Sequence, residues 1–463
     1  MIWRLVIFFL LVSTVPITAQ RTFSDQTFYQ LVIKNHPLAK QANLELEIGR
    51  VGVLKAKGSF DPKAYNSLDQ KYYNSYQYYS LLDAGLKIPT WYGLEIKTGF
   101  ENNRGVYIDN QAKSPSGGLW YGGASITLGK GLFIDERRAE LFKAKVYQES
   151  TVYERKLQLN ELLYEAGYSY WNWFLAHNSR VVLAEALELA KIRFEAVKQS
   201  AILGDRPFID SVEAKIQVQN REALFRGAEA EQQGTGNKLA SFLWEENLTP
   251  LELDSLTKPV SSDSVGIKIQ LELAQSMIDS ALSNHPYLQI TNFKIKGLEI
   301  DQRLKKEQLK PKLDLNYNFL NEPINYNPFN QFSVNNYKWG VNFEMPVFLR
   351  KERGDYQLAG IKLQNEKLNF ENNRAYLLSK IQNAFIDLQN SVNQLEIYRK
   401  TVDDTKRLLD AEIMMFEIGE SSLFLINARE TAYIQSKLKF IECIAKNQQA
   451  FLTMQFAMAQ LFN

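Results

Sequence analysis

The sequence predicts an α+β chain built twice on one plan, in which short helices lead into strands and the strands lead into a long helical hairpin. Three observations predict this class. A tripeptide block recurs, several segments alternate apolar and polar residues, and two long stretches are almost free of glycine and proline. With 463 residues the chain is too long for one simple core, and 54 basic against 52 acidic residues argue against a dedicated nucleic-acid binder.

The N-terminus, residues 1–20, is typical of a secretory signal peptide. Arg4 precedes an apolar run, and small residues follow at Thr18 and Ala19. A membrane anchor at the same place is the alternative. No later run of about 18 apolar residues is present, so we expect an exported chain without a membrane-spanning helix. A role in the membrane would then need a β-barrel, because only helices and closed barrels satisfy the backbone in lipid.

The internal repeat is the most informative feature of the sequence. Asn-His-Pro at 35–37 recurs at 284–286, and the block 132–217 matches the block 347–432 in length. Chance does not readily produce matches at both ends of such long blocks, so we infer an internal duplication. Each copy opens with a short helix, a break before proline and a second helix, at about 38–59 in the first copy.

The histidines at these breaks have a structural explanation. His36 and His285 each precede a proline, and we expect them to serve the geometry of a helix end rather than a chemical function. The remaining histidine, His177, has no metal-ligand spacing around it. Cys443 is the single cysteine, which excludes an internal disulfide framework and a multi-cysteine zinc site.

Strands are expected after the second helix of each copy. Apolar and polar residues alternate over Tyr337–Met345, Leu313–Phe319 and Tyr92–Phe100, and more weakly over Trp120–Leu128. Alternation over about nine residues is typical of membrane-barrel strands, although a half-buried soluble sheet gives the same pattern. Export and the many tyrosines favour the barrel, whose membrane interfaces are rich in aromatic residues.

The number of strands in the first copy stays open. The polar segments 101–118 and 321–336 are rich in Asn, Gly and Pro and are expected to form external loops. The first copy also has extra residues between Pro62 and Leu132, including a strand-like stretch over Tyr76–Ile88. An even number of strands returns the chain to the side it left, so this copy has either two long strands or four shorter ones.

Long helical hairpins are expected to follow the strands. Residues 136–203 contain no proline and only Gly167, so a continuous helix would span on the order of 100 Å at 1.5 Å per residue. Gly204 and Gly419 then break each long helix and form the hairpin tips. Gly234-Thr235-Gly236 is expected to interrupt the return helix of the first hairpin. A coiled-coil seam follows the heptad spacing of Leu183, Leu187, Ala190, Phe194 and Val197.

One chain is not enough for the assembly that this pattern requires. Two β-hairpins cannot close a barrel, and lipid does not tolerate open strand edges. Two helical hairpins likewise cannot form a wide tube. The sequence therefore predicts a cyclic oligomer with a β-barrel at one end and a helical tube beneath it.

At this point the chain resembles the TolC-family outer-membrane efflux proteins over essentially its full mature length. The features that carry the resemblance are the Asn-His-Pro blocks, the alternating strands followed by Met345–Phe348, and the turns Leu203–Gly204 and Ile418–Gly419. No single motif is specific, but their duplicated order is. The resemblance implies a homotrimer whose strands contribute to one shared transmembrane β-barrel and whose helical hairpins form a periplasmic α-barrel. It also implies a place in the outer membrane and contact with its lipid.

The resemblance gives each segment an expected role. The segments are a signal peptide (1–20), first-repeat periplasmic helices (21–62), outer-membrane strands (63–131) and a helical hairpin (132–244), an inter-repeat linker (245–269), and second-repeat periplasmic helices (270–311), outer-membrane strands (312–346) and a helical hairpin (347–463). It further implies two kinds of partner, a periplasmic membrane-fusion adaptor and an inner-membrane pump. We expect a passive exit duct, with no enzyme activity, cofactor or metal. The alternative is a structural coiled-coil protein that scaffolds the periplasm.

Two sets of site residues follow from the resemblance. The hairpin tips are expected to dock the adaptor, or their glycines only cap helices; these residues are Leu203, Gly204, Asp205, Ile418, Gly419 and Glu420. The candidate gate consists of Asp210 and Glu213, which share one helix face and could form a ring of six carboxylates in a trimer, together with Arg206. An ordinary solvated helix face is the alternative. The second copy departs from the family pattern, because it has Leu425 and Ala428 at the matching positions.

Overall fold

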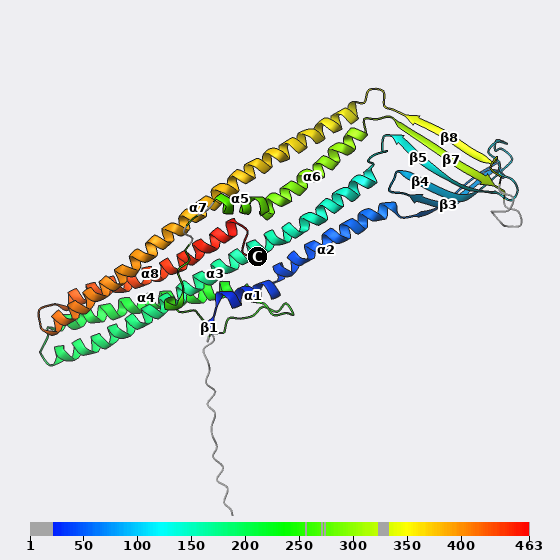
Figure 1. Ribbon diagram of the computed structural model, residues 1–463. Helices are drawn as coiled ribbons and strands as arrows, with labels where there is room; N and C mark the ends of the chain where they lie inside the picture. Colours follow the sequence, from blue (N-terminus) through cyan, green and yellow to red (C-terminus); the bar gives the residue numbers. More distant parts are fainter. Residues whose placement is uncertain (1–21, 255–256, 270–271, 273–274, 323–332, 463) are drawn as a thin grey trace, which may run out of the picture. The chain divides into compact units, whose positions relative to one another are not determined.

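The computed structural model describes residues 22–254, 257–269, 272, 275–322 and 333–462, and Figure 1 shows their arrangement. The signal-peptide prediction falls on residues outside this set. The chain forms two compact units, which are described separately. The first unit comprises residues 1–40, 159–273 and 381–463, and the second comprises residues 41–158 and 274–380.

Long helices, one six-stranded antiparallel sheet and one short two-stranded parallel sheet make up most of the regular structure. The helices are α1 (Asp25–Asn35), α2 (Pro37–Lys57), α3 (Glu136–Ile202), α4 (Phe208–Ala240), α5 (Gln275–Asn284), α6 (Pro286–Glu307), α7 (Arg350–Glu417) and α8 (Leu423–Ala457). The strands are β1 (Thr22–Phe23), β2 (Lys63–Tyr73), β3 (Tyr76–Pro89), β4 (Leu94–Arg104), β5 (Leu119–Gly129), β6 (Lys258–Pro259), β7 (Lys312–Asn321) and β8 (Tyr337–Glu344). No helix within the described ranges is both long and apolar enough to cross a membrane.

The second unit carries a six-stranded sheet with the order β2-β3-β4-β5-β7-β8, in which every neighbouring pair is antiparallel. Four of these strands precede α3, which decides between the two strand counts left open for the first copy. β2 and β3 meet at a two-residue turn, where Asn74 and Ser75 both have positive φ and so match the twist of a hairpin. The predicted loop over 101–118 begins in the last residues of β4, and residues 323–332 of the other predicted loop lie outside the described set.

Four helical segments of the second unit pack side by side, as Figure 1 shows. α2 contacts α3 through Arg155, whose Nε donates to Oδ1 of Asn43 at 2.7 Å. α3 contacts α6 through the ion pair of Lys143 with Asp301, at 2.8 Å. α6 contacts α7 through Lys294 and Glu366, at 2.9 Å. The helix order α2-α3-α6-α7 therefore matches the strand order, because α2 precedes β2, α3 follows β5, α6 precedes β7 and α7 follows β8.

The first unit is built around an aromatic core between α1 and α3. Phe28 of α1 stacks on Tyr170, with ring centroids 5.8 Å apart, and both side chains are fully buried. Trp173 and Phe174 of α3 complete the core. Gly167 is required nearby, because a Cβ at that position would collide with the hydroxyl group of Tyr29. This explains the one glycine within the long helix.

The four long helices of the first unit meet near the hairpin turns. A buried cluster joins Val197 of α3, Ala214 of α4 and Leu423 of α8, with Phe194 and Phe416 of α3 and α7 packed against it. The predicted seam of α3 is confirmed, since Leu183, Leu187 and Ala190 are also buried. These contacts bind the two hairpins, α3–α4 and α7–α8, to each other.

The predicted interruption of the first return helix is wrong. α4 continues through Gly234-Thr235-Gly236 and ends at Ala240. The hydroxyl group of Thr235 donates to the carbonyl oxygen of Glu231, four residues earlier, so the side chain adds a bond to the helix. A glycine costs a helix only about 1 kcal/mol, which the surrounding packing offsets.

The histidine prediction is confirmed in both copies of the Asn-His-Pro block. Nδ1 of His36 accepts a hydrogen bond from the backbone N–H of Leu38, and Nδ1 of His285 accepts one from Tyr287, each at 3.2 Å. These bonds satisfy N–H groups at the start of α2 and α6, which lack partners within the helix. Burial lowers the pKa of His36, which favours the neutral ring that accepts the bond.

Candidate functional site

The sheet of the second unit has one polar face and one apolar face. Residues that pair directly across antiparallel strands project to the same side, so the register assigns each residue to a face. The polar face includes Tyr65, Asp83, Lys97, Tyr121, Thr127, Asp314, Asn316 and Asn342, and the apolar face includes Leu86, Ile96, Trp120, Leu315, Tyr317, Trp339 and Phe343. Trp339 is 66% exposed and Phe343 is 67% exposed. Together these residues form a large exposed apolar surface, which marks an interaction with a partner or a membrane.

Hydrogen bonds organise the polar face. The hydroxyl group of Tyr121 donates to Oδ1 of Asp83 at 2.6 Å, and Tyr121 also contacts the hydroxyl group of Tyr65. Further along β5, the hydroxyl group of Thr127 donates to Oδ1 of Asp314 on β7 at 2.6 Å. The polar groups thus satisfy one another along the surface. This face is therefore fit to contact water.

The two outer strands of the sheet, β2 and β8, have no second neighbour in the described chain. Each presents a row of backbone N–H and C=O groups along one edge, which is a template for pairing with another strand. With six strands in alternating directions, β2 and β8 run antiparallel to each other. The sheet can therefore be extended by copies of itself in an antiparallel ladder.

The two hairpin turns of the first unit have the same geometry. Gly204 and Gly419 both have φ of 84°, a conformation that residues with a Cβ rarely adopt. The next N–H donates back into the preceding helix: that of Asp205 to the carbonyl oxygen of Ser200 at 3.0 Å, and that of Glu420 to Met415 at 2.9 Å. This is the Schellman arrangement, which closes a helix C-terminus with a glycine.

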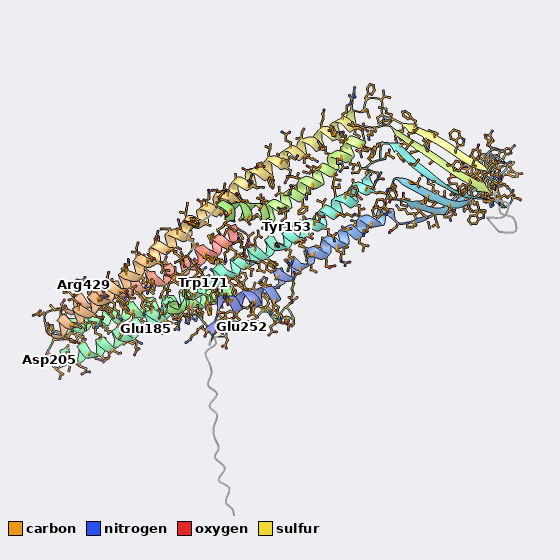
Figure 2. All side chains as sticks on the ribbon, in the orientation of Figure 1. Tyr153, Trp171, Glu185, Asp205, Glu252 and Arg429 are labelled. Atoms are coloured by element: carbon orange, nitrogen blue, oxygen red, sulfur yellow. The ribbon has the colours of Figure 1, made fainter. Side chains whose placement is uncertain are left out.

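The tips expose apolar side chains beside acidic ones. Leu203 is 75% exposed and Ile418 is 68% exposed, and Asp205 and Glu420 are exposed as well. Figure 2 shows Asp205 at the turn between α3 and α4. Each tip therefore offers a large apolar residue and a carboxylate on either side of a glycine turn. Whether an adaptor contacts them stays a prediction.

The candidate gate residues lie near the tips but do not form one cluster. Nη1 of Arg206 is 3.9 Å from Oδ2 of Asp210, and its guanidinium lies 4.3 Å from the centre of the Phe416 ring. Oε1 of Glu213 accepts a hydrogen bond from Nδ2 of Asn427 at 3.1 Å. Asp210 is thus joined to Arg206, and Glu213 to α8. A ring of six carboxylates in a trimer stays a prediction.

The matching positions of the second hairpin, Leu425 and Ala428, are both exposed on α8. They add apolar surface to this end of the unit and supply no charge. The first hairpin alone therefore carries the charged gate candidates that the resemblance identifies.

Comparisons with known proteins agree on the fold. No protein-family model matches the chain, and no curated protein matches it in sequence. Solved structures do match. The Campylobacter jejuni CmeC outer membrane channel gives a TM-score of 0.65 at 14% identity, covering 95% of this chain and 86% of that chain. The open state of the Neisseria gonorrhoeae MtrE outer membrane channel gives 0.70 at 13% identity, covering 94% and 89%. The outer membrane protein VceC from Vibrio cholerae gives 0.64 at 11% identity, covering 94% and 96%.

This chain has the fold of these outer-membrane channels. The resemblance noted in the sequence predicted that fold, and the prediction is confirmed at the level of the single chain. The match covers nearly all of both chains. The sheet and both hairpins therefore belong to the channel fold.

One buried charge cluster of the channel fold escaped the sequence analysis. Glu430 of α8 forms an ion pair with Arg193 of α3, and Nη2 of Arg221 on α4 donates to the hydroxyl group of Thr431 at 2.9 Å. Burial lowers the pKa of Arg221, while the nearby Glu430 carboxylate acts in the opposite direction. These residues come from three helices that are distant in sequence, so no spacing could have indicated their contact.

Proposed function

We propose that the chain is the outer-membrane exit duct of a tripartite efflux or secretion machine. It conducts substrates passively from a periplasmic adaptor and an inner-membrane pump to the exterior. The observation that carries the proposal is the sheet with one exposed apolar face and one hydrogen-bonded polar face. In a membrane barrel the apolar face contacts lipid and the polar face lines the water-filled interior.

The strand edges support a shared barrel. An open edge is not tolerated in lipid, so β2 and β8 need partners from other copies. β8 of one copy then pairs antiparallel with β2 of the next. Three copies would contribute eighteen strands, six from each. Barrels of 16–18 strands leave an aqueous channel.

The register of the sheet supports tilted strands, as a barrel requires. The row of paired residues that begins at Lys63, the first residue of β2, passes through Lys87, Lys97 and Gly123. It reaches Asn318, well past the middle of β7. Such a stagger between neighbouring strands accompanies the tilt of strands in a closed barrel.

The helices supply the periplasmic part of the duct in this proposal. A groove of about 930 Å³ lies between α3 and α4, and it is lined by apolar residues that include Leu175, Leu183 and Leu224. Leu224 is 52% exposed in the single chain, so the groove offers apolar surface to a helix of a second copy. The hairpin tips face the adaptor, and the α3–α4 and α7–α8 pairs, each preceded by strands, support the internal duplication.

The location follows from the same argument. The matched structures are described as outer membrane channels, and an exported chain with an amphipathic sheet fits that membrane. We therefore place the sheet in the outer membrane and the helices in the periplasm. The contacts with lipid, adaptor and pump are parts of this proposal.

Imaging of the purified protein tests the proposal. Particles extracted by detergent from the outer-membrane fraction should be hollow tubes with three-fold end views, and they should form ion-conducting pores in planar bilayers. A solid rod, or a compact particle that gives no conductance, would favour the alternative of a periplasmic scaffold.

A further inference from the structure

Lysines occupy one row of paired residues across the polar face of the sheet. Lys63 of β2 pairs with Lys87 of β3, and Lys87 pairs with Lys97 of β4. The row continues through Gly123 and Asn318 to Lys338 of β8. We call these four lysines the lysine row.

Such a row is electrostatically unfavourable on its own, because like charges directly opposite each other destabilise a sheet. Lys97 has one ion pair, with Glu95 at 3.3 Å. The ammonium group of Lys87 lies 4.3 Å from the centre of the Tyr65 ring. Lys63 and Lys338 form no ion pair with any residue in the described ranges. The row therefore carries more positive charge than its contacts neutralise.

The other carboxylates of this face leave most of the row unbalanced. Asp314 is 2.7 Å from Nζ of Lys312, a lysine outside the row, and also accepts a bond from Thr127. Its carboxylate also attracts Lys97, the lysine of the row that already pairs with Glu95. Asp83 accepts a hydrogen bond from the hydroxyl group of Tyr121. Along their strands, Asp83 and Glu101 lie four residues from the row, about 13 Å at 3.3 Å per residue. That distance exceeds the screening length of about 8 Å at physiological salt.

We propose that the lysine row is an anion-binding site that takes multivalent oxyanions such as phosphate groups. Lys63, Lys87 and Lys97 lie on neighbouring strands with Cβ atoms about 4.5–5.5 Å apart, so these three ammonium groups can converge on one oxyanion. Ammonium–oxyanion bonds are charge-assisted and short, which makes them stronger than neutral hydrogen bonds. The inference rests on the proposed function in one respect, that the polar face meets water inside the duct. Three copies would each contribute a row, and the duct would favour anions there.

Calorimetry with the assembled full-length protein tests the site directly, with inorganic pyrophosphate as the probe at low salt. The test variant combines Lys63→Gln, Lys87→Gln and Lys97→Gln. We expect wild type to bind pyrophosphate and the variant to bind at least about tenfold more weakly, because the charged donors are lost. A variant with arginine at the same three positions should retain binding.

A matched control removes three lysines from elsewhere in the same unit, through Lys71→Gln, Lys113→Gln and Lys130→Gln. It should bind pyrophosphate as wild type does, which separates the row from overall charge. Wild type that binds no pyrophosphate, or a test variant that binds it as tightly as wild type, would overturn the inference.

Pore recordings distinguish this inference from the proposed function. Under a salt gradient, the reversal potential of the test variant should show greater selectivity for cations than those of wild type and the control. If wild type forms no pore, the proposed function fails, and the calorimetry still decides whether the row binds oxyanions. An unchanged reversal potential in a conducting test variant would count against the row.

Discussion

Replacing Glu430 by glutamine should loosen the helical end of the first unit more than any surface charge change on the same helices. The Glu430 side chain is 8% exposed, and Arg193, its ion-pair partner, is 25% exposed. Removal of the carboxylate leaves the guanidinium groups of Arg193 and Arg221 without the negative charge that Glu430 supplies to both. Breaking a buried ion pair from one side costs about 3–5 kcal/mol. Water reaches a quarter of the Arg193 side chain and screens it, so we expect about 3 kcal/mol, at the lower limit.

Hydrogen exchange of the assembled protein measures this change where it occurs. If the free energy of local opening falls by about 3 kcal/mol, the backbone amides of α8 around residue 430 should exchange about a hundredfold faster. Glu185→Gln is the matched control, because Glu185 and Lys437 join the same two helices at 3.2 Å but are 60% and 35% exposed. It should cost less than about 1 kcal/mol. Equal protection from hydrogen exchange in the two variants would refute the claim that the buried Glu430 carboxylate stabilises this end of the unit.

Three further predictions follow from the structure. Gly204→Val or Gly419→Val forces a branched residue to φ of 84°, at about 1–3 kcal/mol, and should abolish export in efflux assays while cross-linking still detects trimers; normal export would contradict it. Burial lowers the His177 pKa from 6.5 to about 4, so the folded state favours the neutral ring. The contribution of His177 to folding stability is therefore fully present above pH 6.5, and up to about 3 kcal/mol of it is lost as the pH drops to 4. In thermal melts from pH 7 to 4, His177→Gln should lose that slope, and an unchanged slope would exclude the histidine. Trp339→Arg on the apolar face should cost about 2–4 kcal/mol of folding stability in lipid vesicles, whereas Asn342→Arg on the polar face of the same strand should cost far less.

Local patterns in the sequence predicted much of the fold because they reflect local physics. Alternation with period two placed strands at Tyr92–Phe100 and Leu313–Phe319. β7 covers the second range, and β4 covers the first from Leu94 onward, because Tyr92 and Gly93 lie in the turn before it. A glycine after a long proline-free stretch marked both hairpin tips, since a positive φ is available to glycine at no steric cost. The local failure at Gly234-Thr235-Gly236 shows the limit of this reasoning. There, packing and a threonine side-chain bond override weak helix propensity.

The site was less predictable, because it depends on register and on contacts between distant segments. The acidic gate candidates could be named because the resemblance implies acidic residues at those positions after Gly204. Their partners could not be named, since Arg206 lies over Phe416 of α7 and Glu213 bonds to Asn427 of α8. The cluster around Glu430 gave no signal, because three helices supply it. Such contacts become visible only when the hairpins are packed together.

The lysine row shows how strand register can create a property that no segment contains. Lys63, Lys87 and Lys97 are ordinary solvated lysines when each strand is considered alone. A shift of one residue in the pairing of β3 would move Lys87 to the apolar face and break the row, since side chains alternate with period two. The apolar face holds the register in place, because the same shift would also turn Leu86 and Ile88 away from the exposed apolar surface. The hydrophobic pattern that fits the sheet to a membrane therefore also aligns the charges on its opposite face.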